Sequence, residues 1–167
     1  MTPAYADQVV TWRYPKPYDV YDMVDADPGF LAEPTSGFHA LVDAGELIGF
    51  RSFGDDGQVP GGPYAGATPT GGTVLDTGGG LRPDLTGRGL GRRAIATGLL
   101  FGVHTYGPDA FRVTVAAFNE RAHRVVESLG FVRGAGFRAS TDSREFVIFT
   151  GDSQVLDVAC RAFSGAP

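Results

Sequence analysis

The stretch GGGLRPDLTGRGLGRR, which runs from Gly78 to Arg93, decides how this 167-residue chain is interpreted. It holds six glycines and four arginines, although the whole chain carries a formal net charge of −5. Glycine lets a ligand approach the backbone closely, and arginine indicates that this ligand is anionic. The stretch lies between a predicted strand and a predicted helix, and the N-terminus of a helix binds anions. It therefore predicts a phosphate-binding loop.

The rest of the composition excludes several other classes of protein. Hydrophobic residues make up 43% of the chain, and no apolar run approaches the roughly 18 residues of a membrane span. A pI near 5.0 argues against general nucleic-acid binding. The single cysteine, Cys160, excludes an internal disulfide framework, and the N-terminus MTPAYADQVV lacks the features of a secretory signal. We therefore expect a cytoplasmic protein that binds neither nucleic acid nor membrane. The three histidines, His39, His104 and His123, lack ligand spacing, so no metal site is predicted.

Apolar periodicity predicts one α/β domain with a mixed sheet. The predicted strands are Val9–Tyr14, Phe38–Val42, Leu47–Phe53, Val74–Leu81, Phe111–Phe118, Phe131–Phe137 and Glu145–Thr150. Helices are predicted from the prolines at 15–17, over 89–106, and from an N-cap at Asn119 to a C-terminal glycine at 130. The tail after residue 151 can hold a short helix. The region 54–72 is a long loop, and loops of this length are usually functional or disordered.

Two familiar phosphate loops do not fit the Gly/Arg stretch. A P-loop requires G-x-x-x-x-G-K-[ST], but Gly91 is followed by Arg92 and Arg93. A dinucleotide fingerprint requires G-x-G-x-x-G directly after a strand, and here RPDLT intervenes and the glycine spacing differs. Acyl-CoA binding, in which the loop receives a diphosphate, and a loop with incidental glycines remain.

The stretch LRPDLTGRGLGRR resembles the pyrophosphate-binding motif of the GNAT superfamily of acyl-CoA-dependent N-acetyltransferases, R/Q-x-x-G-x-G/A after a strand ending in x-x-P. Pro83, Arg88, Gly89 and Gly91 occupy matching places. Downstream, FNERAHRVVESLGF resembles the second family segment, N-x-x-A-x-x-x-Y-x-x-x-G-F, through Asn119 and three further matching residues at 122, 130 and 131. The resemblance implies a GNAT-like domain with a mixed, mostly antiparallel sheet flanked by helices. It also implies a cofactor core over about 74–150, acceptor-side elements over about 9–73, and a tail over 151–167.

The resemblance implies that acetyl-CoA is the cosubstrate. The residues that it assigns to cofactor binding are Gly80, Leu81, Thr86, Gly87, Arg88, Gly89, Leu90, Gly91, Arg92 and Asn119. Backbone groups near 79–81 would pair with pantetheine and polarise the thioester carbonyl. Two positions depart from the family pattern. Thr86 replaces the long R/Q donor, and Val126 replaces a tyrosine that in many members protonates the departing thiolate.

Two residues are candidates for proton transfer. Asp76 precedes the glycine cluster on the same strand, where family members often carry an acid, so we expect a general base there. The alternative is a solvent-facing strand carboxylate. His123 falls on the same helical face as Asn119 and Val126, so it is a candidate proton donor. The alternatives are an exposed helical histidine and protonation of the thiolate by water.

On the acceptor side, aromatic residues are the candidate substrate-binding group: Trp12, Tyr18, Tyr21 and, in the long loop, Tyr64. They would suit a partly apolar amine or a cation–π contact, and the alternative is a place in the core. The expected function is acetyl transfer to a primary amine of a small molecule or amino acid derivative. The alternatives are a non-catalytic acyl-CoA-binding module and an acetyltransferase for protein N-termini or lysines. Family members often dimerise, so a homodimer stays open.

Overall fold

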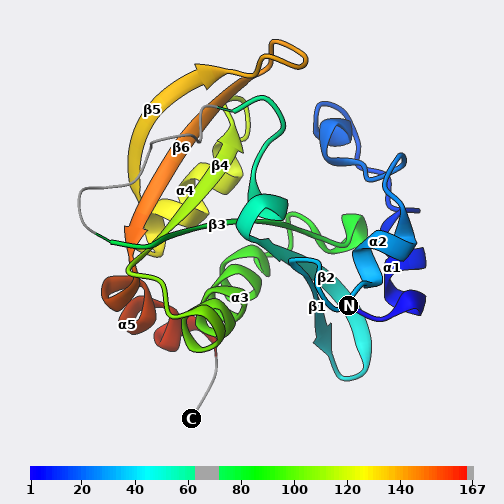
Figure 1. Cartoon of the computed structure of the whole chain (residues 1–167), viewed down its shortest axis with the longest axis horizontal. Coiled ribbons are helices and arrows are strands. Elements are labelled where there is room, and N and C mark those ends of the chain that lie inside the picture. The colour runs from blue at the N-terminus through cyan, green and yellow to red at the C-terminus, as the bar shows by residue number, and fades with distance from the viewer. Residues whose placement is uncertain (63–71, 165–167) are drawn as a thin grey trace.

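The computed structural model describes residues 1–62 and 72–164 of the chain. Six strands form one mixed sheet in the order β1-β2-β3-β4-β6-β5 (Figure 1). The strands are β1 (Phe38–Asp43), β2 (Glu46–Phe53), β3 (Val74–Leu81), β4 (Ala110–Ala116), β5 (Val132–Arg138) and β6 (Glu145–Asp152). The helices are α1 (Pro3–Val9), α2 (Pro28–Ala32), α3 (Gly91–Tyr106), α4 (Glu120–Ser128) and α5 (Ser153–Ser164), with 3₁₀ turns η1 (Tyr18–Tyr21), η2 (Gly54–Gly57) and η3 (Pro83–Leu85).

The sheet is antiparallel except where β3 meets β4. These two strands are parallel over only three residue pairs, from Val74 with Ala110 to Asp76 with Arg112. From Thr77 onward β3 pairs with β2 instead, while β4 continues beside β6. The two strands therefore diverge after the Asp76–Arg112 pair, and Figure 1 shows β3 and β4 running in different directions. We call this point of divergence the fork.

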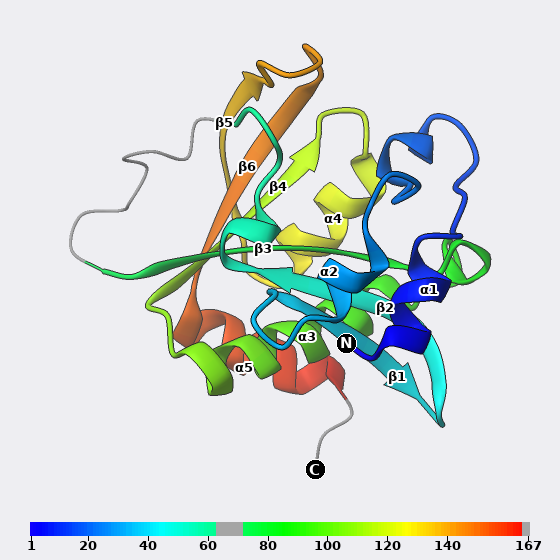
Figure 2. The same ribbon diagram turned by 45° about the vertical axis from the view of Figure 1, so that its right-hand side comes forward.

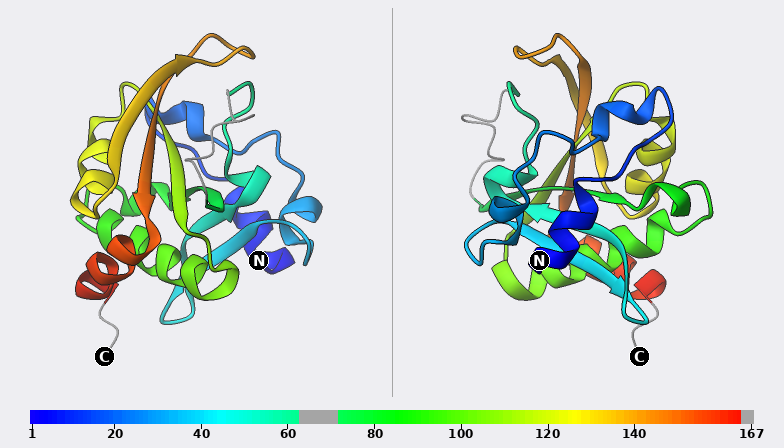
Figure 3. Two further views of the ribbon diagram at one scale, coloured as in Figure 1. Left: turned by 60° about the vertical axis from the view of Figure 1, so that its left-hand side comes forward. Right: turned by 90° about the vertical axis from the view of Figure 1, so that its right-hand side faces the viewer.

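Helices cover both faces of the sheet. The larger core cluster joins α3, α4 and α5 to β4 and β6, and its fully buried members include Leu99, Phe111, Leu129, Phe149 and Leu156. A second cluster joins α1 and α2 to the opposite face of β2 through residues such as Val9, Leu31 and Phe50. Figure 3 shows α1 and α4 on opposite sides of the sheet. The fork thus lies between two separately packed halves.

Most of the predicted elements are confirmed, including the hairpin β1–β2, strand β3, helices α3 and α4, and strands β4 to β6. The Asn119 side chain caps α4 by accepting from the Ala122 amide at 3.1 Å. The predicted first strand, Val9–Tyr14, is wrong. Thr2 instead caps the helix α1, which runs through Val9. This helix is favoured over a strand because it buries Ala6 and Val9 on one face.

Two other segments also differ from the expectation. The region expected to hold a helix after the prolines forms only η1 and, later, the five-residue α2. The tail forms the twelve-residue α5, whose Leu156 and Cys160 are fully buried in the larger cluster. No helix in the described part of the chain is long and apolar enough to cross a membrane.

Candidate active site

Past the fork, one edge of β3 has no strand partner among the described residues. The Arg82 amide donates to the Ile48 carbonyl at 2.9 Å, so Arg82 and Ile48 form a hydrogen-bonded pair of the antiparallel ladder. In the next pair, Leu81 with Gly49, the N–H and C=O groups of Leu81 therefore point away from β2. Alternation then places the N–H and C=O groups of Gly79 on the same side as those of Leu81. At the other end of β3, the Thr73 carbonyl accepts from the Ala110 amide at the start of β4. Because Thr73 is an even number of residues from Gly79 and Leu81, the outward groups of all three lie on the side of β3 that faces β4. We call the side of β3 over residues 77–81 the fork edge.

A glycine-rich turn follows the fork edge and leads into α3. Gly87 and Gly89 have φ values of +75° and +80°, which only glycine adopts readily. Helix α3 begins at Gly91, and no side chain caps its N-terminus. Its first N–H groups are therefore available to a ligand, at the positive end of the helix dipole. The turn therefore presents backbone N–H groups that could receive an anion at the end of β3.

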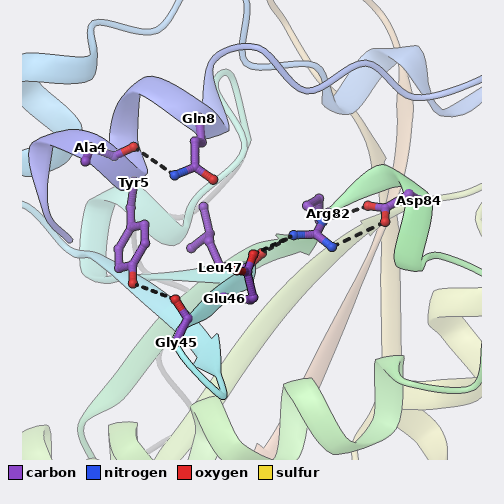
Figure 4. A network of polar contacts seen from close by, with 8 residues as sticks. All are labelled: Ala4, Tyr5, Gln8, Gly45, Glu46, Leu47, Arg82 and Asp84. Carbon is purple, nitrogen blue, oxygen red and sulfur yellow. Dashed lines mark hydrogen bonds and ion pairs between the residues drawn. The ribbon is translucent and has the colours of Figure 1, made fainter.

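Thr86, which replaces the long family donor, has a local role. Its hydroxyl donates to the Pro83 carbonyl at 2.8 Å and closes η3 just before the glycine turn. Arg82 also has a structural place. It donates to the Leu47 carbonyl at 3.0 Å and to the Asp84 carboxylate at 2.7 Å, as Figure 4 shows. These bonds attach the turn to the start of β2, so Arg82 is not free to bind a phosphate.

The remaining arginines of the loop are exposed. Arg88 lies between the two positive-φ glycines, and the Arg92 guanidinium lies 4.8 Å from the centre of the Phe163 ring on α5. Sequence reasoning missed another arginine at this place. A Cβ atom on Gly87 would lie 3.6 Å from the Arg121 guanidinium of α4, so Arg121 stands beside the glycine turn. Its only sequence signal is its position two residues after the N-cap Asn119.

The glycine cluster 78–80 does not interrupt β3, which is continuous over Val74–Leu81. Each glycine instead admits a neighbour. Gly79 has a φ of +146°, and a Cβ there would lie 2.4 Å from the Phe50 carbonyl oxygen. A Cβ on Gly78 would lie 2.9 Å from the Ser52 hydroxyl. A Cβ on Gly80 would lie 2.9 Å from the Tyr14 hydroxyl. The three glycines therefore admit close neighbours within a continuous strand.

Asp76 lies at the fork, but its carboxylate is occupied and buried. Arg112 Nε donates to Oδ1 at 2.5 Å, and Arg112 Nη2 donates to Oδ2 at 2.7 Å. Gln58 Nε2 donates to Oδ2 at 2.9 Å. The sequence allowed either a solvent-facing carboxylate or a free general base at this position. The structure shows neither. A carboxylate bound on both oxygens by a guanidinium is an anchor for the two strands rather than an available base.

His123 lies on the predicted face of α4, but this face is buried. The ring is 1% exposed, its Nε2 bonds with the Ala116 carbonyl at 3.1 Å, and its centre lies 5.1 Å from that of Phe149. Val126 on the same helix is buried as well. The face of α4 that carries both residues therefore packs on β4 and β6. This position gives His123 a structural role and leaves no exposed proton at its ring.

The N-terminal aromatic residues are divided between core and site. Trp12 is 7% exposed and packs against Phe50, so it belongs to the core. The rings of Tyr18 and Tyr21 in η1 lie 5.6 Å and 6.4 Å from the ring of Phe118, which precedes α4, and Figure 2 shows η1 beside α4. Asn119 Nδ2 donates to the Tyr21 hydroxyl at 3.1 Å. Tyr64 lies outside the described residues.

Arg121 links η1 to the glycine turn. Its guanidinium lies 4.2 Å from the centre of the Tyr18 ring and beside Gly87. Helix α4 therefore contacts both the N-terminal segment and the glycine turn. Within residues 1–62 and 72–164, no cluster of histidine, cysteine and carboxylate side chains could hold a metal ion.

Tyr14, mentioned above as the neighbour of Gly80, reaches the fork edge. Its hydroxyl donates to the Leu81 carbonyl at 2.6 Å, and its amide donates to Asp22 at 2.8 Å. Burial, and then the nearby Asp22 carboxylate, raise the pKa of the Tyr14 phenol well above its usual value. The phenol is therefore neutral at physiological pH. Its sequence position, in what looked like the end of a strand, gave no signal of this contact.

Solved structures with the same fold include several acetyltransferases. One is the aminoglycoside acetyltransferase AAC(6')-Ib in complex with ribostamycin and coenzyme A, with 18% identity and a TM-score of 0.68 over 99% of this chain and 96% of that one. Another is a chimera of the spermidine N-acetyltransferase SpeG from Vibrio cholerae and hSSAT, with 15% identity and a TM-score of 0.64 over 92% and 94%. An uncharacterized protein from Bacillus halodurans gives 11% identity and a TM-score of 0.76 over 98% and 87%.

No curated protein sequence matches the chain. The model of the acetyltransferase (GNAT) family matches residues 4–131, which include the fork, the glycine turn and α4. This match covers well over half of the chain, and the GNAT family consists of acetyltransferases that use acetyl-CoA. The protein with its diverging strands and uncapped helix is thus a member of the GNAT acetyltransferase family.

Proposed function

We propose that this protein transfers the acetyl group of acetyl-CoA to the primary amine of a small molecule or amino acid derivative. One observation carries the proposal: the unpaired fork edge of β3 leads directly into a glycine turn and an uncapped helix N-terminus. An extended ligand with an amide-bearing arm and a diphosphate matches this order of backbone donors. The proposed division of the chain is a cofactor core over 74–150, acceptor-side elements over 9–73, and a tail over 151–167 that completes the core through α5.

The chain offers a separate set of groups to each part of that ligand. The amides from Gly87 to Gly91 and the exposed guanidinium groups of Arg88 and Arg121 would hold the diphosphate. The outward backbone groups of Gly79 and Leu81 would pair with the pantetheine arm. Arg92, which lies over Phe163, and Thr86, which closes η3, contribute to the shape of the turn.

Acetyl-CoA supplies a thioester whose carbonyl carbon accepts the amine. A fork-edge N–H group, fixed in place by β2, would stabilise the oxyanion that develops on the carbonyl oxygen. The amine forms the new C–N bond, and the C–S bond breaks to release the thiolate. Because Arg112 occupies Asp76 and α4 buries His123, we assign both proton transfers to water. The water would take a proton from the amine and return one to the sulfur.

A small acceptor is favoured over a protein chain by two facts. Tyr18 and Tyr21 of η1 contact Phe118 and Asn119 at the start of α4, so this segment would restrict access to the acceptor side. Ribostamycin in one structural relative and spermidine in the name of another are both small amines. Trp12 is not part of the proposed acceptor site, because it is packed in the core.

Release of free thiol from CoA esters tests this function. The assay offers acetyl-, propionyl- and succinyl-CoA with n-butylamine, benzylamine, phenylalanine amide, spermidine and a lysine-containing peptide. We expect thiol release above the hydrolysis blank with acetyl-CoA and a small amine, and an acetylated product of matching mass. Thiol release with the peptide alone would instead favour a protein acetyltransferase. Binding of CoA without any release would leave only an acyl-CoA-binding module.

A further inference from the structure

The Tyr14 phenol lies at the fork edge, and its proton is held in a hydrogen bond to the backbone. Its hydroxyl donates to the Leu81 carbonyl at 2.6 Å. A phenol has one proton, so the hydroxyl oxygen can offer only lone pairs to any further group. The Leu81 carbonyl belongs to the backbone stretch that the proposed function assigns to the pantetheine arm and thioester. An acceptor of hydrogen bonds is therefore held on the fork edge, at the end nearer the glycine turn.

The surrounding residues fix this phenol in position. The Tyr14 amide donates to Asp22, which closes the segment that carries η1. Gly80 leaves room for the hydroxyl, since a Cβ there would lie 2.9 Å from it. The same Cβ would lie 3.3 Å from the Phe50 ring, which belongs to the core under α1 and α2. The phenol thus approaches β3 from the face that α1 and α2 cover.

We propose that the Tyr14 hydroxyl oxygen accepts a hydrogen bond from the N–H of the incoming amine and aligns its nitrogen with the thioester. This inference rests on the proposed function and assigns a positioning group for the acceptor. Tyr14 does not transfer a proton in this role. Its elevated pKa keeps the phenol neutral throughout the working pH range. The amine then loses its proton to water, as assigned above.

Tyr14→Phe removes only the hydroxyl, and the chain offers a matched control. Tyr5 also donates its hydroxyl to a backbone carbonyl, that of Gly45 at 3.3 Å, in the network of Figure 4 away from the fork edge. Both variants are measured with the amine that reacts fastest in the panel named above. The measurements are CoA binding by calorimetry, binding of this amine to the protein–CoA complex, and kcat/KM for the amine as a function of pH.

For Tyr14→Phe we expect amine binding to the CoA complex and kcat/KM for the amine each to fall about tenfold, as for loss of one hydrogen bond in a desolvated site. CoA affinity should stay within about twofold, and the pH profile should keep its shape. Gly80→Ala, whose Cβ would displace the hydroxyl, should lower amine binding by a similar factor, with no further loss of amine binding when combined with Tyr14→Phe. Tyr5→Phe should match the wild type in every measurement.

Unchanged amine binding in Tyr14→Phe would overturn the inference, and so would an equal loss of CoA affinity, which would place the effect on β3 itself. A pH limb that disappears in Tyr14→Phe would also overturn it, because Tyr14 would then be a proton donor or base. Failure of the proposed function is distinguishable from these results. In that case the wild-type protein itself releases no thiol with any amine of the panel.

Discussion

Asp76 and Arg112 face each other on the last residue pair that joins β3 to β4, and their side chains form a buried two-bond ion pair at that place. One strand supplies the carboxylate and the other the guanidinium, so the pair connects the two halves of the sheet just before they separate. The position where family members often carry an acid is thus occupied by an anchor. The geometry of the fork depends on this contact.

Removing one partner of this pair should strongly destabilise the protein. Asp76→Asn leaves the Arg112 charge buried without its carboxylate, and we expect a loss of about 3 kcal/mol in the free energy of unfolding. The control is Glu145→Gln, which breaks an exposed cross-strand pair with Arg138 and should cost about 0.5 kcal/mol or less. Urea denaturation measures both. Equal small losses in the two variants would contradict the anchoring role.

Gly79 should tolerate no side chain. Gly79→Ala forces a φ of +146° on a residue with a Cβ and places that Cβ 2.4 Å from the Phe50 carbonyl oxygen. We expect a loss of about 2–3 kcal/mol in stability, together with weaker CoA binding because β3 must move. Gly136→Ala in β5 is the matched control, since its nearest contact, the Phe146 carbonyl oxygen, would lie at 3.4 Å. A Gly79→Ala protein as stable as Gly136→Ala would show that β3 is not tightly fixed.

Local signals in the sequence were sufficient for the glycine turn and most of the sheet. The hairpin, the positive-φ glycines after Pro83 and the Asn119 cap each depend on residues a few positions apart. A strand was wrongly predicted at Val9–Tyr14 because VVTWRY has strand-forming composition, while the burial of Val9 and Trp12 under β2 is a tertiary effect. Propensity alone could not decide between the two.

The chemistry of the site depended on contacts between distant residues. Asp76 and Arg112 are 36 positions apart, and Tyr14 and Leu81 are 67 apart. No spacing rule reveals such pairs in one sequence. The helical wheel placed His123 and Val126 on one face correctly, but it could not say that this face is the one that packs on the sheet. The role of Asp76 therefore required the structure.

Arg121 should contribute to CoA binding as a cation beside the glycine turn. Arg121→Gln keeps the length of the side chain and removes its charge, so we expect CoA affinity to fall about tenfold or more, the range of a hydrogen bond to a charged group. Arg124→Gln lies three residues further along α4, also at an exposed position, and should change the affinity by less than about twofold. Calorimetric titration at two salt concentrations measures both. If the two variants weaken binding equally, the effect is only that of net charge.

The buried thiol of Cys160 should make stability fall at alkaline pH. Burial, and then the Asp157 carboxylate, raise its pKa from the ordinary 9.0 to about 11. Between these values the unfolded chain loses the thiol proton while the folded protein keeps it, so the folded state binds more protons. Its contribution is therefore fully present below pH 9 and is lost as the pH rises to about 11. We expect a loss of about 2 kcal/mol over this interval, which Cys160→Ala should lack. Urea titrations of both proteins from pH 8 to 11 give the difference, from which the contribution of Tyr14 cancels because both proteins retain it. Parallel stability curves would contradict the assignment.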